Sequence, residues 1–82
     1  MKRLYCFRSR EGVIYIVTNG NRFLPEFEGE YYGSYGSVEQ LIRELSAGNT
    51  LYFPRGIDTS ALGLPTDLAD WSACVGGRPC FV

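Results

Sequence analysis

The chain has no histidine and only three cysteines among its 82 residues. A structural zinc site usually needs four cysteine or histidine ligands, and this set does not supply them. A cysteine nucleophile normally takes its base from a histidine, which is absent here. We therefore expect a protein that is not an enzyme and that binds no metal and no cofactor. We expect Cys6 to be a buried thiol, and Cys74 and Cys80, which flank a flexible loop, to stay reduced.

The chain also lacks a strong net charge and a long hydrophobic run. Its formal net charge is −1, so no overall field attracts nucleic acid or an anionic membrane. No run approaches the ~18 apolar residues of a membrane span. The first residues, MKRLYCF, resemble the start of a signal peptide, but Arg8, Arg10 and Glu11 interrupt the apolar region that it would need. The pattern favours a cytoplasmic protein with no membrane partner.

What is present suits one small domain spanning residues 1–82, with 45% hydrophobic and 15% aromatic residues. Residues 2–9 and 13–18 predict two strands, the second of them β-branched or aromatic throughout. Asn-Gly after them is typical of a type I′ turn, so residues 21–27 should return as a third strand. Pro25 should place that strand at an edge of the sheet or end it. The segment TLYFP, residues 50–54, predicts a fourth strand.

One helix is predicted over residues 38–47. Ser37 suits the N-cap, Gln40 completes a capping box, and Gly48 suits the C-terminal left-handed position. The fold class is therefore α+β: a small antiparallel sheet, a meander of three strands plus a fourth, packed against one helix, with an irregular C-terminal tail. In that tail, LPTDLADW predicts a short helix capped by Thr66, and residues 80–82 a last short strand.

The segment EYYGSYGS, residues 30–37, raises the first question of function. No lysine follows its last glycine, so it is not a phosphate-binding P-loop, and it is best interpreted as the loop that leads into the helix. Three tyrosines are too many for one loop to bury, so at least one should lie at the surface. Before them, PEFEGEY would place three carboxylates on one side of an extended chain. The candidate partner-binding residues are Glu26, Glu28, Glu30, Tyr31, Tyr32 and Tyr35. The alternative is a charged edge strand that discourages aggregation.

The two faces of the sheet raise the second question. Alternation predicts Arg3, Tyr5 and Phe7 on one side of the first strand, with Leu4 and Cys6 on the other. The predicted helix can pack on one face of the sheet. The simplest expectation is that the apolar part of the tail packs on the other face, although a partner could also cover it. An uncovered face could be a basic and aromatic platform for single-stranded nucleic acid. Its residues would be Arg3, Tyr5, Phe7 and Tyr15.

The leading interpretation is a non-enzymatic protein-binding module whose partner presents a basic patch. Size and surface character favour a small inhibitor of the kind used in conflicts between phages and bacteria, comparable to anti-CRISPR or immunity proteins. The alternative is a single-stranded nucleic-acid-binding protein that uses the basic and aromatic face. The sequence does not set the oligomeric state.

Overall fold

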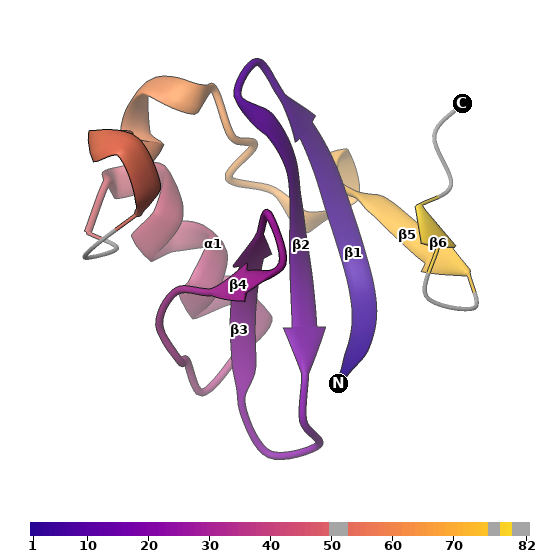
Figure 1. Ribbon diagram of the computed structural model, residues 1–82. Coiled ribbons are helices and arrows are strands. Elements are labelled where there is room, and N and C mark those ends of the chain that lie inside the picture. Colours follow the sequence, from indigo (N-terminus) through magenta and orange to yellow (C-terminus); the bar gives the residue numbers. More distant parts are fainter. Residues whose placement is uncertain (50–52, 76–77, 80–82) are drawn as a thin grey trace.

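The computed structural model describes residues 1–49, 53–75 and 78–79. Within these residues the strands form one antiparallel sheet in the order β4-β3-β2-β1-β5-β6, and one α-helix packs on it (Figure 1). The elements are β1 (Lys2–Ser9), β2 (Gly12–Thr18), β3 (Phe23–Phe27), β4 (Glu30–Tyr31), α1 (Val38–Ala47), the 3-10 helices η1 (Pro54–Gly56), η2 (Thr59–Leu62) and η3 (Leu68–Asp70), β5 (Ser72–Val75) and β6 (Arg78–Pro79). The predicted α+β fold is confirmed.

Helix α1 begins and ends where its capping residues predict. Ser37 Oγ accepts a hydrogen bond from the Gln40 N–H at 3.1 Å, and Gly48 takes a φ of 77° just past the last turn. Gln40 Oε1 accepts from the Gly36 N–H at 3.2 Å, one residue earlier than the reciprocal bond of a capping box. Both ends are thus fixed by local sequence. The buried stripe of α1 is Leu41, Ile42 and Leu45.

Pro25 neither ends β3 nor lies in an edge strand, which corrects the prediction. It sits in the middle of β3 opposite Ile16, and the two-residue β4 forms the edge beyond it. The Pro25 carbonyl accepts from the Tyr32 N–H at 2.9 Å. Because the N–H and C=O of one strand residue point the same way, the donor that proline lacks faces β4 and not β2. The ladder between β2 and β3 is therefore not interrupted.

The tail differs from prediction in two places. Phe53 is buried but lies outside any strand, and Pro54 opens the 3-10 helix η1. The rest of the predicted fourth strand, residues 50–52, and the predicted last strand, residues 80–82, fall outside the described residues. The short helix η3 is capped by Asp67, whose carboxylate accepts from the Ala69 N–H at 3.0 Å, and not by Thr66.

The main hydrophobic cluster lies on one face of the sheet, and Cys6 and Val17 are also fully buried on the other face. Helix α1 and the tail residues both pack on the face that carries this cluster, and the rings of Phe7 and Trp71 lie 5.6 Å apart. The expectation that the tail covers the second face is therefore wrong. Figure 1 shows α1 and the 3-10 segments on the same side of β1, β2 and β3. The buried core residues are Ile14, Ile16, Phe27, Leu41, Ile42, Leu45, Phe53, Leu62, Leu64 and Trp71.

Candidate functional site

A β-bulge at Leu4 decides which side chains share a face. Arg3 pairs with Val17 and Tyr5 pairs with Ile16, so one residue of β1 is left over between two successive residues of β2. An extra residue shifts the alternation of a strand, which turns Arg3 to the face opposite Tyr5. The sequence pattern had predicted the two on one side. In so short a strand, the alternation of apolar and polar residues does not reveal a single extra residue.

The predicted nucleic-acid platform is consequently divided between the two faces. Tyr5 and Phe7 pack against the core on the side of α1. Arg3 and Tyr15 lie on the other side, where the Arg3 guanidinium carbon stands 3.9 Å from the centre of the Tyr15 ring. The structure therefore does not bring these four residues together.

We call the side of the sheet opposite α1 the outer face. Cross-strand pairs share a face, so the register of the ladders defines its members. None of them belongs to the core cluster, and α1 lies on the other side of the sheet (Figure 1). The outer face consists of Arg3, Cys6, Arg8, Val13, Tyr15, Val17, Leu24, Glu26, Tyr31, Ser72 and Cys74.

An ion pair occupies the centre of the outer face. Arg3 donates from Nε to Glu26 Oε1 at 3.0 Å and from Nη2 to Oε2 at 2.9 Å, a two-point contact across three strands. The Glu26 side chain is 8% exposed and that of Arg3 is 37% exposed. The hydrogen bond to Glu26 raises the pKa of Arg3 above its ordinary value, against an opposing effect of burial. The charges of Arg3 and Glu26 thus cancel. The planar guanidinium of Arg3 also rests on the ring of Tyr15.

Apart from the exposed Arg8 and the partly buried Ser72, the remaining members form an apolar surround with graded exposure. Val17 and Cys6 are fully buried. Val13 and Leu24 are partly buried, and Tyr31 is 45% exposed. The outer face is therefore mostly apolar, with a neutralised polar centre.

The acidic segment is a hairpin and not an extended strand. Glu28 has a φ of 52° and Gly29 a φ of 81°, so the chain reverses between β3 and β4. Glu26 is left buried on the outer face, whereas Glu28 and Glu30 are exposed in and after the turn. The expectation that three carboxylates share one side is wrong, because burial of Phe27 in the core fixes β3 and the turn follows at once.

The three tyrosines have three different surroundings. Tyr31 is exposed and pairs with Glu26, which confirms that at least one of them lies at the surface. The Tyr32 ring lies 4.8 Å from that of Phe53 and packs against the core. Tyr35 is held by two backbone hydrogen bonds to Phe23, at 2.8 and 2.9 Å, and also packs against the core. Of the six predicted partner-binding residues, the outer face holds Glu26 and Tyr31, and Glu28 and Glu30 adjoin it in the hairpin.

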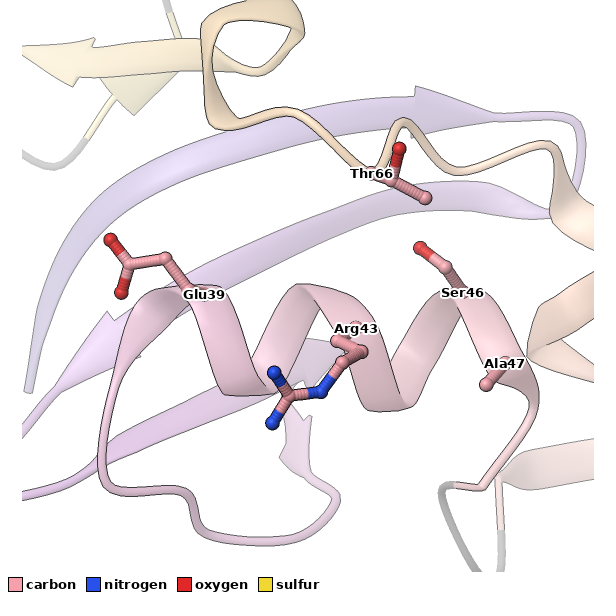
Figure 2. A pocket seen from close by; sticks show the side chains of 5 residues that line it. All are labelled: Glu39, Arg43, Ser46, Ala47 and Thr66. Atoms are coloured by element: carbon pink, nitrogen blue, oxygen red, sulfur yellow. The ribbon is translucent and has the colours of Figure 1, made fainter.

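A groove beside α1 gave no signal in the sequence. Its volume is about 540 Å³, and Figure 2 shows Thr66 across from the helix, with the Ser46 hydroxyl directed toward it. Ser46 Oγ is buried and has no hydrogen-bond partner among the described residues. The groove is lined by one acidic residue, one basic residue and three small side chains. This combination does not indicate a particular class of ligand. The lining residues are Glu39, Arg43, Ser46, Ala47 and Thr66.

Two of the three cysteines lie within the described residues. Cys6 is a buried thiol, as predicted, and Cys74 is a partly buried thiol, whereas Cys80 lies outside the described residues. Across residues 1–49, 53–75 and 78–79 there is no cluster of three or more potential metal ligands. In the same part of the chain no helix has the length and apolar character needed to cross a membrane.

Comparison with known proteins adds no relative. The chain matches no protein-family model, no curated protein and no solved structure. The function must therefore be argued from the geometry of this chain.

Proposed function

We propose that the chain is a non-enzymatic protein-binding module and that its outer face is the binding surface. The observation that carries the proposal is the combination of an apolar sheet face with a neutralised ion pair at its centre. Protein interfaces have this character: an apolar centre poor in net charge, with aromatic residues and arginine enriched. Tyr15, Tyr31 and Arg3 are residue types that dominate binding energy where they are desolvated.

The same geometry disfavours single-stranded nucleic acid. That class of ligand needs a positive groove and exposed rings on which bases stack. Here Glu26 cancels the charge of Arg3, and the rings of Tyr5 and Phe7 face the core. The divided platform therefore leaves protein as the better candidate partner.

The hairpin next to the outer face extends the proposed surface. A face five strands wide at about 4.8 Å per strand, and some five residues long at about 3.3 Å each, offers on the order of 400 Å². A standard interface buries about 800 Å² on each partner. The partner must therefore reach beyond the face, and Glu28 and Glu30 in the exposed hairpin would meet a basic patch.

A protein-binding module of this kind can inhibit its partner by covering part of the partner's surface. We attach two further elements to the proposal: the role of a small inhibitor in conflicts between phages and bacteria, and a cytoplasmic location. Size and surface character support the inhibitor role.

Affinity capture from the organism that encodes the chain, followed by mass spectrometry, tests the proposal. Leu24→Asp changes a partly buried side chain of the outer face, and Arg43→Asp changes an exposed side chain of α1 as the matched control. We expect the wild-type protein and the control to recover the same protein, and Leu24→Asp to lose it while keeping its circular dichroism spectrum. Tight and salt-sensitive binding to an oligonucleotide, with no protein recovered, would instead favour nucleic acid.

A further inference from the structure

The Arg3 guanidinium lies at the centre of the outer face and is the more exposed partner of its ion pair, at 37% against 8% for Glu26. One of its flat sides rests on Tyr15, at 3.9 Å from the ring centre. Of the five N–H donors of a guanidinium, two are used by Glu26. The others, including both on Nη1, make no hydrogen bond within the described residues. Arg3 therefore presents unused donors at its exposed edge, held in place by the groups beneath it.

The charge balance restricts what those donors can accept. Glu26 is buried and already matches the charge of Arg3, so a carboxylate or a phosphate placed at Arg3 would leave one negative charge in excess beside Glu26 in a desolvated interface. Arg8, the other charged residue of the outer face, lies five residues along β1, opposite Val13. A partner lysine or arginine would face the Arg3 cation at close range. An uncharged carbonyl oxygen satisfies the donors and leaves the cluster neutral, which makes it the least costly acceptor.

The surroundings restrict the rest of the partner segment. Val17 and Leu24 lie in one row with Arg3, and Val13 lies beyond Tyr15. A segment placed over Arg3 thus meets apolar side chains on both sides. Resting on the proposed function, we infer that the partner contributes a polypeptide segment that offers an uncharged carbonyl oxygen to Arg3, flanked by apolar or aromatic side chains, and that Glu26 is the residue that keeps acidic partners out.

Selection of random peptides displayed on phage tests this inference with a defined probe. The full chain is immobilised in parallel as the wild type and as Glu26→Gln, Arg3→Lys and Leu24→Asp. Glu26→Gln keeps an oxygen acceptor for Arg3 but leaves its charge unbalanced. Arg3→Lys keeps the charge for Glu26 but loses the planar edge of donors. Circular dichroism confirms that each variant is folded.

We expect the wild type to enrich apolar and aromatic peptides that are poor in Asp and Glu. Their affinity should fall about tenfold in Arg3→Lys, and it should change little between low and high salt. Selection on Glu26→Gln should enrich acidic peptides, whose binding weakens with salt. If Glu26→Gln does not fold, the salt dependence of peptide binding to the wild type still tests the inference.

Each other outcome has a definite meaning. Acidic peptides selected by the wild type, or binders that tolerate Arg3→Lys, would overturn the inference while the outer face remains the binding surface. Binders indifferent to Leu24→Asp, or no binders at all, would contradict the proposed function as well.

Discussion

Removal of Arg3 should cost more stability than removal of the charge on Glu26. Loss of one partner from a fully buried ion pair costs about 3–5 kcal/mol, because the other charge stays buried alone. Since the Arg3 side chain is 37% exposed, water can replace part of what Glu26 loses, and we expect Arg3→Met to lower the free energy of unfolding by about 2–3 kcal/mol. Glu26→Gln buries no charge and keeps an acceptor, so its cost should be about 1 kcal/mol.

The double variant separates this explanation from general damage to the sheet. Arg3→Met with Glu26→Gln removes both charges, and its cost should be about 1–2 kcal/mol, less than the sum of the two single changes. Urea unfolding measures all three, and for a domain of this size each kcal/mol corresponds to about 4–8 °C in Tm. Arg43→Met, at an exposed position of α1, should stay within about 0.5 kcal/mol of the wild type. Additive costs for the two single changes would refute the reasoning.

Three further predictions concern the core and the caps. Tyr32→Ala should lower the free energy of unfolding by about 2 kcal/mol because the ring packs against the core, whereas Tyr31→Ala should leave the Tm unchanged; equal Tm values for both variants would contradict the assignment. Thr59→Val should raise stability by about 1 kcal/mol in urea unfolding, since the buried Oγ1 has no partner among the described residues; a loss of stability would show that the hydroxyl is satisfied in solution. Hydrogen bonds from the Ser60 hydroxyl and N–H lower the pKa of Asp58 below its ordinary 3.8, so the stabilisation is present above that pH and is lost as pH falls through the folded-state value. The Tm difference between the wild type and Asp58→Ala should therefore narrow in acid, and a difference that is constant from neutral pH to strong acid would contradict the cap.

The elements that the sequence predicts well are those with local signals. The β-branched run of residues 13–18 and the Ser37 and Gly48 caps each act within a few residues of chain, and the structure has the corresponding elements.

The chain also reverses at Asn-Gly, but the predicted type I′ turn is wrong: four residues separate Thr18 from its partner Phe23, and Gly20 has a positive φ whereas Asn19 does not. Pro25 was harder to place, because the sequence does not show whether its missing donor faces a neighbouring strand or the short edge strand.

The candidate site depends on relations that no local pattern contains. The bulge at Leu4 moves Arg3 to the outer face, and only the register of three strands then brings Glu26 and Tyr15 to it. The sequence placed Arg3 and Tyr15 in one candidate set and Glu26 in another. The pairing of the strands brings members of both sets together, whereas Tyr5 and Phe7 pack against the core and the Phe7 ring lies 5.6 Å from that of Trp71.

The most direct test of the account is the methyl spectrum of the chain with and without the protein recovered by capture. Val13, Val17 and Leu24 report on the outer face, and Ile14 and Ile16 report on the core face of the same strands. The account predicts large changes in chemical shift for the methyl groups of Val13, Val17 and Leu24, and small changes for both isoleucines. Changes at the isoleucines and in α1, with the outer methyl groups unmoved, would contradict the central claim.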